Sequence, residues 1–378
     1  MSSTGYGPKL NPMQLSTLLD HIFQRNLEVS KANQGRGTPV CIWGTHGLGK
    51  TQLVRDYARK HGWKFAYAAP GQFEEMGDLH GMPIIVDPTP DQPNSGDEYT
   101  VFAPPEWVPK EEGPGILLLD DINRADDRIL RGIMQLLQNF ELFSWQLPNK
   151  WQIVATANPE GGDYSVTTMD DAMLTRMVHL SMVFEPRAWA EWAQLSGVDP
   201  RGIAFVLNYP EAVTGKRTTP RTIVQFLELI SSIADWKSKI DLIGHLAMST
   251  LDQSTMAAFL TFVNDELEGL PWPEEILEAK DVALMKKRIT EMAKGKGGES
   301  KRVDRLSALL TRVFMYVTAE GYKPKEKHRE NIADLMLLEV IPNDLRMAMM
   351  SDLSRHPSSN AQSMTKDKRL SKLLLQKL

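Results

Sequence analysis

Short apolar runs alternate with helical patterns along the first half of the chain. Between residue 40 and about residue 181, runs of strand length are separated by stretches whose apolar residues recur at helical spacing. This alternation is typical of a parallel sheet flanked by helices, and it predicts an α/β fold. The runs that predict strands are Val40 to Trp43, Lys64 to Ala68, Ile116 to Leu119, Gln152 to Ala157 and Val178 to Ser181.

A leading helix and a long insertion frame these strands. The helix is predicted by Leu15, Leu18, Leu19, Ile22 and Phe23, which recur at helical spacing. The insertion runs from Gly71 to Gly115 and is rich in proline and acid around Asp87 to Glu98. A loop this long inside a compact domain is usually functional or disordered. The acidic part is more typical of a solvated loop than of a contact site.

After Glu185 the strand pattern stops and helical patterns predominate. Lys294 to Arg302 is rich in lysine and glycine, which is typical of a solvated connection. The segment Lys366 to Leu378 is basic and amphipathic. The predicted helices are Pro186 to Leu195, Pro200 to Leu207, Pro220 to Ile233, Ser254 to Leu267, one through Leu306 to Phe314, Ile332 to Ile341 and Asn343 to Leu353.

Composition is that of an ordinary globular protein. The 378 residues are 42% hydrophobic and 24% charged, enough for two or three domains with buried cores. No apolar run approaches the length of a membrane span and the start carries no signal pattern, so we expect a cytoplasmic protein. The single cysteine, Cys41, lies in a predicted buried strand and argues against disulfides or a cysteine metal site. A net charge of −5 gives no global attraction to nucleic acid.

The most specific motif is a glycine-rich loop directly after the first predicted strand. In such a loop, backbone N–H groups turn toward phosphate oxygens, lysine adds a mobile positive charge, and the threonine hydroxyl can ligate Mg²⁺. The pattern therefore predicts binding of a nucleoside triphosphate. The residues assigned to this binding are Gly44, Thr45, His46, Gly47, Leu48, Gly49, Lys50, Thr51 and Gln52.

Two further strands end in polar residues suited to the same site. Ile116 to Leu119 is followed by Asp120, which would hold Mg²⁺ through water opposite Thr51, and by Asp121, which would orient or deprotonate the attacking water. The alternative is that these acids only cap the helix that begins near Asp126. Asn158 follows another strand and could contact the γ-phosphate, although asparagine before proline is also a good turn residue.

Two arginines are candidates for completing a phosphoryl-transfer site. Arg176 precedes the last predicted strand, and Arg221 opens a helix in the second half of the chain. Isolated arginines are most often solvated. Such a site nevertheless lacks a cation, which a neighbouring subunit or a mobile lid can supply.

With these residues assembled, the chain from about Pro39 to Phe226 resembles the AAA+ ATPases, and within them the MoxR-like group. Residues 120–125 read Asp-Asp-Ile-Asn-Arg-Ala, close to the group's Asp-Glu-Ile-Asn-Arg-Ala, and residues 155–159 are close to its Ala-Thr-x-Asn-Pro. Residues 174–177 match the family's Leu-Asp-Arg-Phe in the leucine and the arginine, and residues 219–221 resemble its Ser-Pro-Arg. Residues 78–81 resemble the Asp-Leu-x-Gly that opens the family's helix-two insert.

The resemblance implies a fold, a set of cofactors and several roles. It implies a P-loop NTPase core at residues 35–185, after an N-terminal helix and linker at 1–34, then an α-helical lid at 186–270 and a C-terminal helical region at 271–378. The implied cofactors are ATP and Mg²⁺. By resemblance, Asn158 is the sensor-one residue, Arg176 the arginine finger that acts on the neighbour's ATP, and Arg221 the sensor-two arginine of the lid.

The resemblance also implies partners, with two departures from the family pattern. Proteins of this group are generally ring-shaped oligomers, often hexamers, and many act as chaperones on a von Willebrand factor A domain protein. Asp121 stands where the family usually has Glu, and its shorter side chain would place the water less well and slow hydrolysis. The segment Phe140 to Ile153 is shorter than the hairpin the group usually carries before sensor one.

Three functions therefore compete. The first is an ATP-driven chaperone that acts on a protein partner, which Phe143, Trp145 and Leu147 could grip if strand alternation places them on one exposed face rather than against their own domain. The second is an ATPase that acts on nucleic acid, motivated by Lys216, Arg217, Arg221, Lys366, Lys368, Arg369, Lys372 and Lys377. The third is a scaffold that binds ATP but scarcely hydrolyses it.

Overall fold

The chain forms two compact units, Met1–Glu185 and Pro186–Leu378. Its computed structural model describes residues 6–31, 35–87, 98–159, 166–265, 271–294, 302–318 and 322–370. The predicted acidic insert, the predicted connection before Arg302 and the predicted tail beyond residue 370 lie largely outside these ranges. The unit boundary follows Glu185, and the further division at residue 270 stays a prediction.

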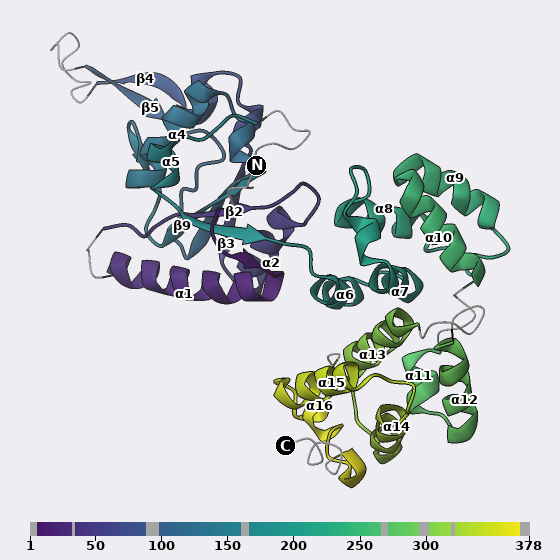
Figure 1. The fold of residues 1–378 in the computed structure, drawn as a ribbon. Coiled ribbons are helices and arrows are strands. Elements are labelled where there is room, and N and C mark those ends of the chain that lie inside the picture. Colours follow the sequence, from purple (N-terminus) through teal and green to yellow (C-terminus); the bar gives the residue numbers. More distant parts are fainter. Residues whose placement is uncertain are drawn as a thin grey trace. The chain divides into compact units, whose positions relative to one another are not determined.

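The first unit is built on a six-stranded parallel sheet (Figure 1). All neighbouring strands in it run parallel, which confirms the predicted α/β fold class. The five predicted strands are confirmed within one residue at either end, and one short edge strand, β1, escaped prediction. In spatial order the strands are β1 Lys9–Leu10, β10 Val178–Met182, β2 Val40–Trp43, β9 Trp151–Ala157, β6 Gly115–Leu119 and β3 Lys64–Ala68.

Alternate residues of each central strand enter two different cores. Val40 and Ile42 pack with the helices α1 (Pro12–Lys31) and α2 (Lys50–Lys60), which cover one face of the sheet. Cys41 and Trp43 point to the other face, which α4 (Asp127–Asn139) covers. Burial raises the pKa of the Cys41 thiol, so this cysteine stays protonated and serves packing. Two covered faces explain why the strands read as continuous apolar runs.

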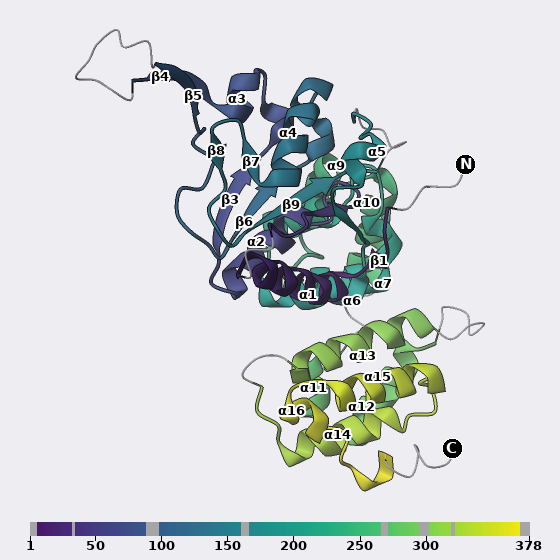
Figure 2. The same cartoon turned by 90° about the vertical axis from the view of Figure 1, so that its left-hand side faces the viewer.

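The predicted long insertion contains regular structure. It holds the short helices η1 (Pro70–Gln72) and α3 (Met76–His80), and then the antiparallel hairpin of β4 (Met82–Val86) and β5 (Tyr99–Ala103). The hairpin projects away from the rest of the first unit in both views (Figure 1, Figure 2). The insertion is thus an arm rather than an irregular loop.

A second, very short hairpin joins β7 (Glu141–Leu142) to β8 (Trp145–Gln146). Trp145 and Leu147 are buried, whereas Phe143 is 55% exposed and lies in the turn with a φ of 51°. The prediction that these three side chains share one face is wrong, because the turn interrupts the strand alternation at Phe143. Two of the three therefore belong to the core.

Within its described residues the second unit is helical, as predicted, but helix ends differ. The helix predicted over Pro220 to Ile233 ends at Ile230, and the one predicted to reach Ile341 ends at Met336. Sequence patterns missed the helices at Ile240–Thr250 and Val282–Met292 and three short ones at Pro210–Val213, Pro273–Leu277 and Ser359–Ser363. The helices are α6 Pro186–Leu195, α7 Pro200–Asn208, η3 Pro210–Val213, α8 Pro220–Ile230, α9 Ile240–Thr250, α10 Gln253–Asp265, α11 Pro273–Leu277, α12 Val282–Met292, α13 Val303–Thr318, α14 Glu326–Met336, α15 Asn343–Arg355 and α16 Ser359–Ser363.

Across the described ranges, the helices fall short of the length and apolar character that crossing a membrane requires.

A buried amide pair ties α1 to the sheet. Asn26 Nδ2 donates to Gln152 Oε1 on β9 at 2.8 Å and to the Thr38 carbonyl at 3.0 Å, while its Oδ1 accepts from the Thr38 N–H at 3.0 Å. Both side chains are buried, so loss of one leaves the other without its partner.

We predict that Asn26→Ala lowers the unfolding free energy of the first unit by about 1–3 kcal/mol, the cost of a buried polar group left unpaired. Urea titration followed by tryptophan fluorescence measures this. Gln24→Ala, an exposed position of the same helix, is the matched control and should leave stability within about 0.5 kcal/mol. Equal stability of the two variants would contradict the structural role of the amide pair.

Candidate nucleotide-binding site

The glycine-rich loop joins the end of β2 to the start of α2. Gly47 and Gly49 have φ angles of 73° and 92°, a left-handed conformation that favours glycine. Gly49 is the N-cap of α2, and no side chain caps this end. A helix start without a side-chain cap, preceded by a glycine-rich loop, is suited to phosphate binding.

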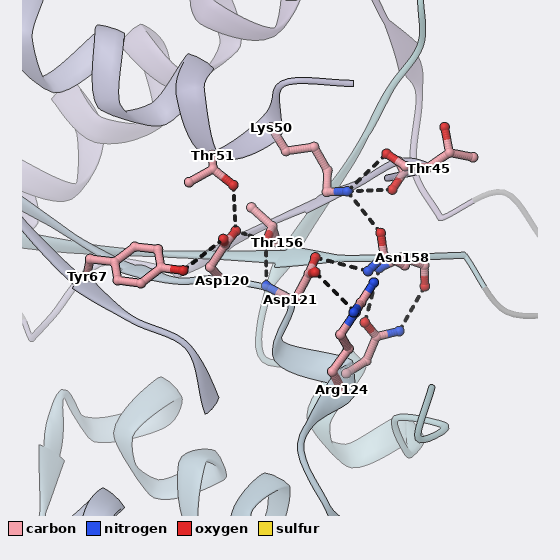
Figure 3. Close-up of polar contacts among 11 residues, drawn as sticks. Thr45, Lys50, Thr51, Tyr67, Asp120, Asp121, Arg124, Thr156 and Asn158 are labelled. Atoms are coloured by element: carbon pink, nitrogen blue, oxygen red, sulfur yellow. Dashed lines mark hydrogen bonds and ion pairs between the residues drawn. The ribbon is translucent and has the colours of Figure 1, made fainter. Parts of the chain in front are cut away.

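Lys50 is buried and held by oxygens. Its Nζ donates to the carbonyls of Gly44 at 2.7 Å and Thr45 at 3.2 Å, and to Asn158 Oδ1 at 3.0 Å (Figure 3). A buried ammonium is costly unless it is hydrogen-bonded, so these oxygens stabilise its charge. The lysine of the loop thus meets the polar residue that follows β9.

Both carboxylate oxygens of Asp120 accept hydrogen bonds from hydroxyl groups. Its Oδ1 accepts from Thr51 at 2.8 Å and from Thr156 at 2.7 Å, and its Oδ2 accepts from Tyr67 at 3.2 Å (Figure 3). Desolvation, and then the charge of Asp120, raises the pKa of Tyr67, which therefore remains a donor. The Thr51 hydroxyl and the Asp120 carboxylate are the oxygen ligands that Mg²⁺ prefers.

The oxygen ligands present fit Mg²⁺ better than they fit a metal ion whose ligands all come from the protein. In the described part of the chain, no group of three or more histidine, cysteine or acidic residues is arranged to hold a metal. Mg²⁺ usually takes one or two protein oxygens and completes its shell with water and substrate phosphates. Thr51 and Asp120 would supply those protein contacts.

Asp121 lies beside this pair in an unusual backbone conformation. Its φ and ψ are 48° and 47°, in the left-handed region, which aspartate tolerates better than most residues. The Asp121 N–H donates to Thr156 Oγ1 at 2.7 Å. Its Oδ1 accepts from Asn158 Nδ2 at 2.9 Å, and its Oδ2 pairs with Arg124 Nε at 3.1 Å. Thr156 therefore fixes both acids at once.

Asn158 is completely buried and locked by a second asparagine. Asn123 Nδ2 donates to the Asn158 carbonyl at 2.8 Å, and the Asn158 N–H donates to Asn123 Oδ1 at 3.1 Å. This pairing leaves the Asn158 carboxamide between Lys50 and Asp121. Asn158 is more than a turn residue.

The helix-cap alternative for the two acids is wrong. Asp126 itself caps α4, since its Oδ1 accepts from the Ile129 N–H at 2.9 Å. Asp120 and Asp121 directly follow β6, which ends at the same sheet edge as β9. Their side chains therefore contact the phosphate loop and the end of β9 instead.

The candidate arginine of the first unit makes its hydrogen bonds outside this network. Arg176 is half-buried at the end of α5 (Asp171–Leu174), where its Nε donates to Gln138 Oε1 at 3.1 Å and its Nη1 contacts the Ala172 carbonyl. Arg221 is exposed in the first turn of α8, in the second unit. Their assigned roles stay predictions.

Sequence reasoning missed four residues of the site. Asn123, Arg124 and Thr156 lie inside the motifs that pointed to it, so their positions offered a signal. Tyr67 offered none, because only the pairing of β3 with β6, with Tyr67 opposite Leu118, brings its hydroxyl to Asp120.

A parallel sheet whose strand ends carry a phosphate loop, a threonine–aspartate pair and a buried asparagine defines the P-loop nucleoside triphosphatase fold. Within this class, residues 39–177 match the AAA domain of the dynein-related subfamily. This part of the chain therefore has the fold of an AAA domain, and AAA domains generally bind and hydrolyse ATP. No curated protein matches the sequence.

Among solved structures, the chain is similar to RuvB of Thermotoga maritima. The K64R mutant is 14% identical over 84% of this chain and 94% of that chain, with a TM-score of 0.38. The structure described as the RuvB Holliday junction branch migration motor is 15% identical over the same shares, with a TM-score of 0.36. Likenesses this distant carry no argument about what this chain acts on.

We predict that Lys50→Ala weakens MgATP binding by about 100-fold or more, because the phosphates lose a charged donor worth roughly 3 kcal/mol. Isothermal titration calorimetry measures the affinity. Lys60→Ala, at the exposed end of the same helix, is the control and should bind as the wild type does. Comparable affinities for the two variants would remove Lys50 from the site.

Proposed function

We propose that the chain is an ATP-hydrolysing, ring-forming MoxR-like AAA+ chaperone that remodels or activates a protein partner. The observation that carries the ATPase part is the convergence of Lys50 and Thr51 with Asp120 and Asn158, through bonds of 2.8 Å between Thr51 and Asp120 and 3.0 Å between Lys50 and Asn158. These are the groups that phosphoryl transfer needs in one place.

Each residue then takes a role set by its contacts. Lys50 would exchange its protein oxygens for the phosphates, and Thr51 with Asp120 would hold Mg²⁺. Asp121 would orient the attacking water, with Asn158 beside it as the residue that senses the γ-phosphate. Mg²⁺ would neutralise the charge that develops on the phosphate oxygens.

Arg176 would act on the ATP of the neighbouring subunit. Its hydrogen bonds go to an amide oxygen and a backbone carbonyl, and within the described ranges no carboxylate pairs with it. A half-buried guanidinium without a counter-ion can pair with an external anion. This supports a ring, which we propose to be hexameric, because a finger helps only where it reaches the next site.

The β4–β5 hairpin supports a protein as the partner. Its Met82, Ile85 and Tyr99 are 69%, 75% and 52% exposed, and residues 82–87 and 98–103 include two acids but no lysine or arginine. An exposed apolar arm of this kind favours a protein surface, whereas nucleic acid phosphates attract cations. We propose that the partner is a von Willebrand factor A domain protein.

Action on nucleic acid is the second candidate. The exposed Lys216, Arg217 and Arg221 favour it, but Asp252, between α9 and α10, accepts from the Arg217 N–H at 3.1 Å and offsets part of the charge. A DNA and RNA binding assay titrated with salt separates the candidates. Salt-sensitive binding supports the second, and its absence removes it.

We predict that Arg176→Ala keeps ATP affinity within about twofold while its turnover falls by about 10³-fold, the lower end of what an arginine finger contributes. Phosphate release at saturating ATP measures turnover. Arg131→Ala, an exposed arginine of α4, is the control. Full activity of Arg176→Ala would reject the role of a finger.

Mixing inactive subunits tests whether the arginine acts between protomers. Asp121→Asn subunits keep Arg176, and Arg176→Ala subunits keep Asp121, so a mixed ring regains some complete sites. Recovered hydrolysis supports the trans role. Mixed rings that assemble and remain inactive contradict it.

A further inference from the structure

A histidine on β10 makes two hydrogen bonds that join the phosphate-loop strand to the segment before Arg176. His179 Nδ1 lies 2.8 Å from Trp43 Nε1, and His179 Nε2 lies 2.7 Å from the Leu174 carbonyl oxygen. An indole N–H only donates and a carbonyl only accepts, so the neutral ring accepts at Nδ1 and carries its proton on Nε2. One tautomer therefore makes both contacts, and together they fix the orientation of the ring.

The Trp43 contact fixes the ring to the end of β2. Trp43 is the last residue of this strand and is 2% exposed, and its indole stacks on Tyr6 with ring centroids 4.0 Å apart. Gly44 follows directly, and its carbonyl accepts from Lys50 Nζ at 2.7 Å. The His179 ring is thus held by the residue from which the phosphate loop begins.

The Leu174 contact fixes the turn that contains Arg176. The Leu174 carbonyl also accepts from the Met177 N–H at 3.2 Å, so residues 174–177 form a turn with Arg176 as its third residue. The guanidinium has its own contacts with α4 and α5. His179 instead holds the backbone of the turn, on which the position of the whole arginine side chain depends.

We propose that His179 is a positioning residue for Arg176, and that it holds the arginine turn against the strand that ends at the phosphate loop. This inference rests on the proposed ATPase function and on the proposed action of Arg176 in the neighbouring subunit. Each ring nitrogen of His179 offers one lone pair or one proton, and Trp43 and Leu174 use both. Loss of His179 therefore lowers turnover and leaves ATP affinity unchanged.

Two amide substitutions separate the two contacts. In His179→Gln the amide nitrogen can take the place of Nε2 and donate to the Leu174 carbonyl. In His179→Asn the shorter side chain places its oxygen near the position of Nδ1, where it can accept from Trp43 but leaves the Leu174 contact unmade. Both variants lose the ring, so a loss of packing affects both.

The test compares phosphate release by these variants at saturating MgATP, with ATP affinity measured separately. Turnover should fall by about tenfold or more in His179→Asn, because a displacement of about 1 Å at a catalytic group can cost up to about 10²-fold. His179→Gln should stay within about threefold of the wild type, and affinity within about twofold in both. His21→Asn and His21→Gln, at an exposed position of α1, are the matched controls.

Mixed rings provide a readout that a general loss of stability would not move. His179→Asn subunits keep Asp121 and the phosphate loop, so an excess of Asp121→Asn subunits, which keep the intact arginine turn, should restore their hydrolysis. An excess of Arg176→Ala subunits, which lack the guanidinium, should not restore it.

The outcomes separate this inference from the function on which it rests. Equal turnover of His179→Asn and His179→Gln, or a defect of His179→Asn that mixed rings do not restore, overturns the positioning role. Inactive Arg176→Ala together with fully active His179→Asn overturns that role alone. Full activity of Arg176→Ala, or absence of hydrolysis in the wild type, overturns the proposed function and the role of His179 with it.

Discussion

The parallel pairing of β9 between β2 and β6 is the constraint on which the site depends. The register sets Trp43 opposite Ala157 and Leu119 opposite Ala155, so the chain leaves all three strands at one edge of the sheet. The residue that follows each strand is Gly44, Asn158 or Asp120. Segments more than a hundred residues apart in sequence are thereby brought within hydrogen-bond distance.

Thr156 and Asn158 make β9 the organising strand at this edge. The Thr156 hydroxyl donates to Asp120 and accepts from the Asp121 N–H, while the Asn158 carboxamide lies between Lys50 and Asp121. Each buried polar group in this network has a partner, as the low-dielectric interior requires. A change at one of these positions is therefore felt at the others.

In the first unit, the sheet is buried on both faces, whereas the β4–β5 hairpin is exposed. The sheet is covered on both faces and holds the nucleotide residues in place, whereas the β4–β5 hairpin leaves large apolar side chains in solvent. Such exposure is unfavourable in an isolated protein unless a partner covers it. The same unit therefore combines a packed site for chemistry with an arm suited to contact.

The sequence by itself determined the strands, the phosphate loop and the paired acids. Local order sets these features: an apolar run long enough for a strand, glycines that permit positive φ, and acids placed directly after a buried strand. The leading helix could also be predicted, because Leu15, Leu19 and Phe23 repeat at helical spacing and are buried together. Helix ends such as Met336 were less well defined, since packing decides where a helix stops.

Only the tertiary structure decided which side chains meet. Tyr67 reaches Asp120 because β3 pairs with β6, and no pattern in the chain records that register. The turn at Phe143 overrode strand alternation. Local patterns report the period of a segment, whereas contacts between distant segments depend on register and packing, which form only when the whole unit folds.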